Sequence, residues 1–192
     1  RVEALREKQL EEYEKSLKEN KSLEEKTFKD QIDLLKKELL KYKVKPDYND
    51  DLELSENIKY LKKQLETIKI QNIIKDKNKN IIKDKKKDSF TLRYQVLTDF
   101  PPKELRKVID HSKQEIKTGI VVGFSTFEGK VGVAVGITNE LTKKYDAVLL
   151  VKTASEVLGG KGGGGRKDFA QAGGTNKDKI EEAFETLSKK IN

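Results

Sequence analysis

The sequence predicts an α+β protein built from two parts. Residues 1–89 are expected to form an antiparallel, coiled-coil-like helical hairpin, and residues 90–192 a small α/β globular domain with a mixed sheet and about three helices. Three observations support this division. Apolar residues in the first part recur at helical spacing, all 13 glycines lie in the second part, and alternating strand-like segments occur only there. The chain starts at Arg1 and has no Met, so we expect a piece of a longer protein.

Two apolar stripes predict the helices of the first part. Each follows a 4-3-4-3 spacing, which places its residues on one helix face. Pro46 and its polar neighbours are expected to end the first helix and turn the chain. Ser55 is the predicted cap of the second helix, with Asn49 or Asp50 if that helix begins earlier. The stripes are Phe28, Ile32, Leu35, Leu39 and Tyr42, then Leu54, Ile58, Leu61, Leu65 and Ile68.

A pair of narrow stripes buries little surface, so residues 1–89 need a further partner. We expect a second copy of the chain and therefore a homodimer. The alternative is a spacer that packs on other parts of the full protein. Downstream, residues 75–87 hold seven lysines against two aspartates in a chain of net charge +8. This lysine run either contacts the phosphates of a nucleic acid or is a solvated helix end or connector.

The second part begins with a strand over residues 91–97 and a helix opened by Pro101 and Pro102. Gly119 is expected to close that helix. Residues 120–127 and 130–138 follow as strands joined by the two-residue turn Glu128-Gly129, a strong hairpin signal. One face of the second of these strands is nearly bare, which implies close approach by a helix or a ligand. The bare positions are Gly132, Ala134, Gly136 and Thr138.

The remaining elements are two helices and one strand. Asp146 is expected to cap an almost wholly apolar helix that runs to Leu158. Residues 168–172 are predicted to form the last strand. Thr175 and Asp178 match a capping box for the final helix.

Between the apolar helix and the last strand lies the most informative segment, residues 159–174, in which eight of sixteen residues are glycine. Lys161 and Arg166 flank four consecutive glycines. Glycine lets the backbone approach a partner closely and permits positive φ. We therefore interpret the segment as a loop that lies against something anionic, flat or both. The alternative is that the glycines only let the chain cross tightly over the sheet.

These motifs carry a family resemblance. The segments GKVGVAVGIT, GGKGGGGR and DFAQAGG resemble the DHH-associated domain family, which includes the C-terminal domain of alanyl-tRNA synthetases and a domain of some DHH phosphoesterases. The resemblance spans about residues 90–192. Two departures are a fourth glycine (Gly162 to Gly165) and Lys167 in place of proline. Arg166 stands where the phosphoesterases commonly have histidine, which argues against the nuclease branch.

The resemblance implies the C-terminal module of an alanine–tRNA ligase. Such a module docks on the elbow of alanine-specific tRNA and supports aminoacylation and editing by upstream domains, in the cytoplasm. The elbow offers phosphates and a flat tertiary base pair, recognised by shape. The alternatives are the substrate-binding domain of a DHH-type phosphoesterase and a coiled-coil interaction protein. The residues expected to bind tRNA are Lys161, Gly162, Gly163, Gly164, Gly165, Arg166, Lys167 and Gln171. Asp168 and Gln171 are expected either to position the loop or to hydrogen-bond sugar hydroxyls.

The sequence gives little support for a catalytic, metal or cofactor site. His111, the single histidine, lies beside Asp110 and Ser112, but adjacent helix positions point in different directions, so we expect an ordinary surface or boundary residue. We predict no catalytic residue, metal site or cofactor in this chain. ATP, Mg²⁺ and, as an option, zinc would serve upstream domains of the full-length enzyme. Cysteine is absent, and the longest apolar run, residues 147–151, is far short of the roughly 20 residues of a membrane span.

Overall fold

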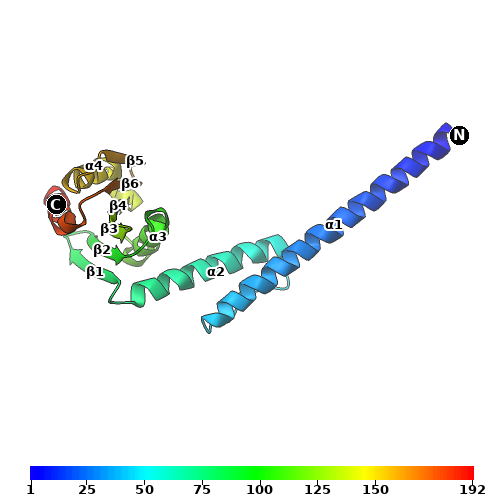
Figure 1. The fold of residues 1–192 in the computed structure, drawn as a ribbon, viewed down its shortest axis with the longest axis horizontal. Helices are drawn as coiled ribbons and strands as arrows, with labels where there is room; N and C mark the ends of the chain where they lie inside the picture. Colours follow the sequence, from blue (N-terminus) through cyan, green and yellow to red (C-terminus); the bar gives the residue numbers. More distant parts are fainter. The chain divides into compact units, whose positions relative to one another are not determined.

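The structure is a computed structural model that describes residues 1–192. The chain forms two compact units, Arg1–Lys69 and Ile70–Asn192 (Figure 1). The structural division lies upstream of Ser89, where the composition changes. The last turns of the second helix and one further strand pack within the globular unit, although their composition resembles that of the first part. The separate roles expected for residues 1–89 and 90–192 stay a prediction.

The first unit consists of helix α1 (Val2–Lys41) and most of helix α2 (Leu54–Lys75). The two predicted stripes meet in one small core, which confirms their helical spacing. Its buried members are Ile32, Leu39, Ile58, Leu61 and Leu65. All residues before Phe28 are exposed, so the first two thirds of α1 contribute nothing to this core.

Helices α1 and α2 run in the same direction, so the antiparallel arrangement predicted for the hairpin is wrong. Near the end of α1, the Glu38 carboxylate lies 3.7 Å from the Lys69 ammonium, while Phe28 lines a pocket with Leu54 at the start of α2. Residues 42–53 carry the chain back between them, and the Gln64 amide donates to the Lys45 carbonyl at 2.9 Å. A twelve-residue segment can extend about 40 Å, enough to return along the roughly 20 Å of helix after Phe28. The start of α2 at Leu54 also places Ser55 inside the helix, so it is not the cap.

The second unit contains a six-stranded mixed sheet of order β1-β2-β3-β4-β6-β5. Strands β2 and β3 are parallel, and all other neighbours are antiparallel. The strands are β1 (Asn80–Lys86), β2 (Thr91–Thr98), β3 (Gly119–Phe127), β4 (Lys130–Ile137), β5 (Gly162–Gly165) and β6 (Phe169–Gly174). The helices are η1 (Pro102–Glu104), α3 (Leu105–Ile116), η2 (Asn139–Leu141), α4 (Ala147–Val157), η3 (Lys177–Lys179) and α5 (Ile180–Lys190). The predicted α+β class and mixed sheet are confirmed.

Helices cover both faces of this sheet. The larger apolar cluster joins one face to α4 and α5, and the smaller one joins the other face to α3 and the end of α2. Helix α3 explains the nearly bare face of β4, because a Cβ at Gly136 would collide with Ile109 of that helix. The close approach inferred from the sequence is therefore made by a helix of the same chain.

Most local predictions for this unit are confirmed. Glu128 and Gly129 both have positive φ, 50° and 78°, as a two-residue hairpin turn requires. Asp146 caps α4, since its Oδ1 accepts the Val148 N–H at 2.9 Å. Two details are wrong. Helix α3 ends at Ile116 and Gly119 already belongs to β3, and the final helix has no capping box, because η3 precedes it and no side chain caps either element.

The lysine run divides among three elements: Lys75 ends α2, residues 76–79 form the turn that follows, and residues 80–86 form edge strand β1, which the sequence did not predict. Arg93 of β2 anchors this strand. Its Nε lies 2.8 Å from Asp84 Oδ1, and its Nη1 lies 3.1 Å from Glu115 Oε1 of α3. Burial lowers the pKa of Arg93, but the hydrogen bonds and charges of the two carboxylates outweigh it and raise the pKa. None of the helices combines the length and apolar composition needed to cross a membrane.

Candidate nucleic-acid interface

The glycine segment is an edge strand, not the predicted loop. Gly162–Gly165 form β5, which pairs antiparallel with residues 170–173 of β6. Glycine has a low strand propensity, so the sequence alone favours a loop. Strand β6 imposes the extended conformation by offering its free edge. The segment therefore has a defined backbone.

Helix α4 fixes where β5 begins. The helix ends at Val157, Leu158 is its C-cap residue, and Gly159 takes a positive φ of 77°. Ser155, which is fully buried on α4, donates its hydroxyl to the Gly173 carbonyl at 2.6 Å and accepts the Gly162 N–H at 3.2 Å. One side chain thus ties the helix to both strands of the glycine hairpin. Sequence reasoning missed this role, because a serine in an apolar helix gives no signal about its partner.

The four glycines of β5 serve different purposes. Gly162 and Gly165 have positive φ, 104° and 149°. A Cβ at Gly163 would collide with the Gln171 carbonyl oxygen, and one at Gly165 with that of Phe169. A Cβ at Gly164, by contrast, would have no heavy atom within 4 Å. Packing within the chain therefore explains three of these glycines and leaves Gly164, which is exposed, without an internal reason.

A tight turn after β5 positions the cations. The Arg166 N–H donates to the Phe169 carbonyl at 2.7 Å, and the Arg166 Nε lies 3.4 Å from Asp168 Oδ1. The Lys167 carbonyl accepts the Ala147 N–H at 3.0 Å, which ties the turn to the start of α4. The backbone of the turn is therefore fixed, while the side chains of Arg166 and Lys167 are exposed.

The expected cations Lys161, Arg166 and Lys167 all lie in solvent around the glycine strand. Lys152 on α4 joins them, since its Cγ lies 4.0 Å from a Cβ position at Gly162. The sequence interpretation overlooked Lys152 because it treated this helix as core. Its placement on the exposed side of an otherwise apolar helix was the available signal. The four cations border a strand edge that has no side chains, which is a surface suited to an anionic and flat ligand.

Gln171 differs from the other residues expected to bind tRNA. Its amide nitrogen donates to the Pro102 carbonyl at 2.6 Å, and its side chain is half-buried. The residue therefore holds β6 against η1, the short helix that precedes α3. Asp168 is likewise engaged, since it pairs with Arg166.

His111 takes part in a structural network. Its Nε2 lies 3.4 Å from Glu115 Oε1, and the buried Ser112 hydroxyl donates to Gln95 Oε1 at 2.8 Å. Asp110 lies 4.0 Å from Arg106. The three adjacent residues thus face different partners and form no nucleophile–base pair.

Comparison with known proteins identifies the family of residues 90–192. The family model described as the DHHA1 domain matches residues 90–192. The alanine–tRNA ligase of Hyphomonas neptunium is 52% identical over 85 residues, which is 44% of this chain and 10% of that protein. That of Parvibaculum lavamentivorans is 48% identical over 87 residues, 45% of this chain and 10% of that protein. The match thus spans about a tenth of these relatives' length.

A solved structure gives the same result at the level of the fold. The C-Ala domain of Aquifex aeolicus alanyl-tRNA synthetase superposes with a TM-score of 0.52 at 36% identity, covering 56% of this chain and 96% of that domain. The resemblance inferred from the glycine motif is confirmed, and the chain belongs to the DHHA1 domain family.

Proposed function

We propose that this chain is the tRNA-binding C-terminal module of an alanine–tRNA ligase, with β5 and its bordering cations as the contact surface. The observation that supports the proposal most strongly is Gly164. It is exposed, it has no steric need to be glycine, and it lies in the middle of a strand flanked by Lys161 and Arg166. Homology to the ligases and to the C-Ala domain supports the same role.

The chemistry of this edge fits folded RNA. Three adjacent exposed glycines, Gly163 to Gly165, let a flat base pair approach the backbone, as the tRNA elbow would require. Lys161, Arg166, Lys167 and Lys152 can neutralise nearby phosphates. Gln171 is better suited to holding the strand than to contacting RNA, because its amide already donates to Pro102.

The proposed module would support aminoacylation and editing of alanine-specific tRNA without performing either reaction. Those reactions, with ATP, Mg²⁺ and any zinc, would belong to other domains of a ligase, since the match covers only 10% of the curated relatives. A role in protein synthesis implies a cytoplasmic location.

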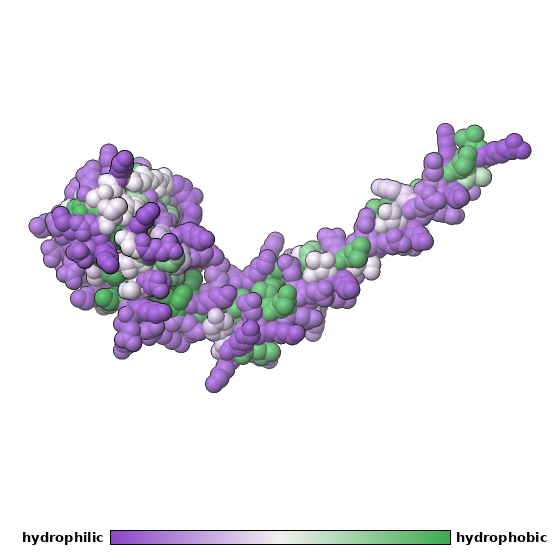
Figure 2. Space-filling view, viewed as in Figure 1, coloured by the Kyte–Doolittle hydropathy of each residue, from purple (hydrophilic) through white to green (hydrophobic).

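We also propose that α1 mediates self-association. Leu10, Tyr13 and Leu17 follow helical spacing and are exposed, and Figure 2 shows apolar side chains at intervals along the otherwise hydrophilic helix. A second copy of α1 would cover this stripe. Leu61 of the second stripe is fully buried within the core of the first unit, so it is not available to a second copy.

A binding titration tests the tRNA proposal. The chain is titrated with alanine-specific tRNA, with single-stranded RNA of equal charge and with a cyclic dinucleotide, and we expect tRNA to bind most tightly. Lys161→Ala with Arg166→Ala should weaken tRNA binding and reduce the salt slope by roughly one unit for each phosphate that the chain no longer neutralises. Lys143→Ala with Lys144→Ala, two exposed lysines on another loop, is the matched control. Preference for the cyclic dinucleotide would favour the phosphoesterase branch, and an unchanged salt slope would remove the two cations from the interface.

A further inference from the structure

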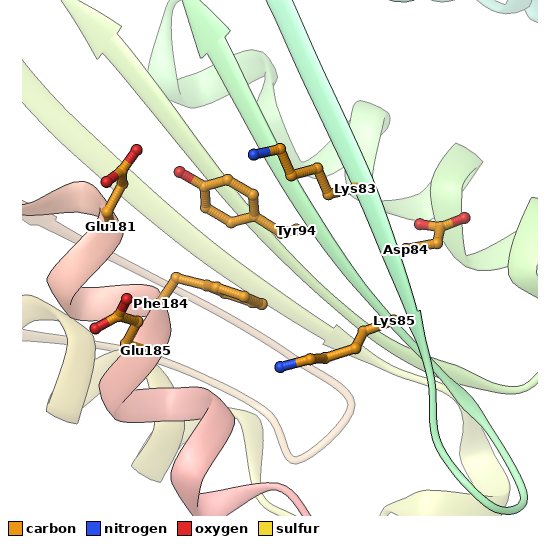
Figure 3. Close-up of a pocket in the computed structure, with 7 residues that line it drawn as sticks. All are labelled: Lys83, Asp84, Lys85, Tyr94, Glu181, Phe184 and Glu185. Atoms are coloured by element: carbon orange, nitrogen blue, oxygen red, sulfur yellow. The ribbon is translucent and has the colours of Figure 1, made fainter.

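A groove lies between β1 and α5 (Figure 3). Strand β1 is at the opposite edge of the sheet from β5. The volume of the groove is about 430 Å³, within the usual range for small-molecule sites. Lys83 and Lys85 of β1 form one wall, and Glu181 and Glu185 of α5 form the other. The groove is thus basic on one side and acidic on the other.

Two aromatic rings form the floor between these walls. Tyr94 of β2 and Phe184 of α5 pack with ring centroids 4.5 Å apart, and both are only half-buried. In Figure 3 the Tyr94 hydroxyl lies between the side chains of Glu181 and Lys83. Burial raises the pKa of Tyr94, and the charge of Glu181 raises it further, so the phenol remains a hydrogen-bond donor at neutral pH.

The two lysines of the basic wall form no ion pair within the fold. No ion pair within 4.0 Å joins Lys83 or Lys85 to any carboxylate. Asp84, which lies between these lysines in sequence, also lines the groove, but its carboxylate is directed away from Tyr94 in Figure 3 and is paired with Arg93. Both ammonium groups therefore remain available to a ligand.

We propose that this groove binds a guanosine monophosphate unit. A purine ring stacks on Tyr94 and Phe184, as unpaired bases stack on aromatic side chains. The carboxylate of Glu181 or Glu185 accepts the two adjacent N–H donors on the Watson–Crick edge of guanine. Lys83 and Lys85 on the opposite wall bind the phosphate.

This arrangement selects guanine among the four bases. Adenine presents an acceptor nitrogen beside its amino group, and that nitrogen would face a carboxylate without a proton between them. Cytosine and uracil offer one donor each and a smaller ring to stack. A site built to accept two hydrogen bonds rejects a base that offers one, because a polar group would be left unpaired.

The guanosine groove is separate from the proposed tRNA contact surface, since it lies at the other edge of the sheet. The guanosine monophosphate unit that fits the groove could be a free nucleotide or an unpaired guanosine within an RNA. The test separates them.

The test follows backbone amide signals by NMR while the whole chain is titrated with GMP, AMP, CMP or UMP. We expect GMP to shift signals of β1 and α5 and to bind about tenfold more tightly than the other three. Glu181→Gln with Glu185→Gln should abolish that preference, and Lys83→Gln with Lys85→Gln should weaken GMP binding about tenfold. The controls Glu182→Gln and Lys86→Gln lie on the same elements outside the groove and should bind GMP as the wild type does.

A second arm compares an oligouridine carrying one central guanosine with one carrying adenosine. A guanosine oligomer that binds more tightly than both GMP and the adenosine oligomer identifies an RNA as the source, and equal binding of the two oligomers with a preference for GMP among the nucleotides identifies the free nucleotide. Absence of shifts at millimolar GMP, equal affinity for all four nucleotides, or equal losses in the control variants would each overturn the proposal. Lys161→Ala with Arg166→Ala should leave GMP binding unchanged, so failure here and failure of the tRNA proposal remain distinguishable.

Discussion

Gly164 and Gly163 make a matched pair that separates ligand contact from packing. A methyl group at Gly164 meets no atom within 4 Å, and the residue does not have a positive φ. Gly164→Ala should therefore keep the fold and raise its free energy of unfolding by about 0.4–1 kcal/mol, because alanine restricts the unfolded chain. Gly163→Ala should destabilise the hairpin by about 1–3 kcal/mol, since its methyl would overlap the rigid Gln171 carbonyl.

Gly164→Ala should weaken tRNA binding although it stabilises the fold. A methyl at Gly164 would hold a flat base pair away from the strand, and a gap of about 0.5–1 Å forfeits a quarter to a half of the dispersion attraction of each atom pair. We expect tRNA affinity to fall about tenfold, equivalent to about 1.4 kcal/mol. The slope of affinity against salt concentration should not change, because the substitution removes no charge.

Two measurements decide this prediction. Urea unfolding gives the stability of Gly164→Ala and Gly163→Ala, and fluorescence anisotropy with labelled tRNA at several salt concentrations gives affinity and slope. A Gly164→Ala chain that is folded and binds tRNA with wild-type affinity would contradict a role of Gly164 in RNA contact. The β5 edge would then be a packing device, and the cations alone would have to account for any binding.

Other substitutions test separate parts of the structure. Ser155→Ala should lower the free energy of unfolding by about 1–3 kcal/mol and speed amide exchange in β5, because two backbone groups lose their partner. Lys152→Ala should reduce the salt slope of tRNA binding by about one unit without changing stability, as a salt titration can show. Stability should fall as the pH rises above about 10, because burial and a neighbouring carboxylate raise the pKa of Tyr94 in the folded state; Tyr94→Phe should reduce that loss in alkaline urea unfolding. Leu10→Lys with Leu17→Lys should convert a dimer to a monomer in sedimentation while helicity is retained, and a monomeric wild type would contradict the proposal.

The elements that the sequence predicted well are those whose signal is local. Helical stripes, the Glu128-Gly129 turn and the Asp146 cap each depend on a few adjacent residues. The relative direction of α1 and α2 depends instead on bonds between the return segment and Gln64, seventeen or more positions apart in sequence. No spacing rule within either helix contains that information.

Strand β1 escaped prediction for a related reason. Its lysines are typical of a solvent-exposed segment, and only Asn80 of the strand is buried. What makes it a strand is the edge of β2 and the pairing of Asp84 with Arg93, which lies nine positions downstream. Of the two aspartates in the lysine run, Asp84 is paired with Arg93, so the run presents more positive charge than its composition suggests.

The candidate interface shows what a glycine motif can and cannot predict. The motif predicted an exposed, cation-bordered segment, and that placement is present in the structure. The motif alone could not distinguish glycines that need positive φ or close approach to β6 from one that needs neither. Because Gly162, Gly163 and Gly165 would be required even in a protein without a ligand, only Gly164 separates the two interpretations. RNA contact at this edge is therefore supported by Gly164 and by the positive charge of its neighbours, rather than by the number of glycines.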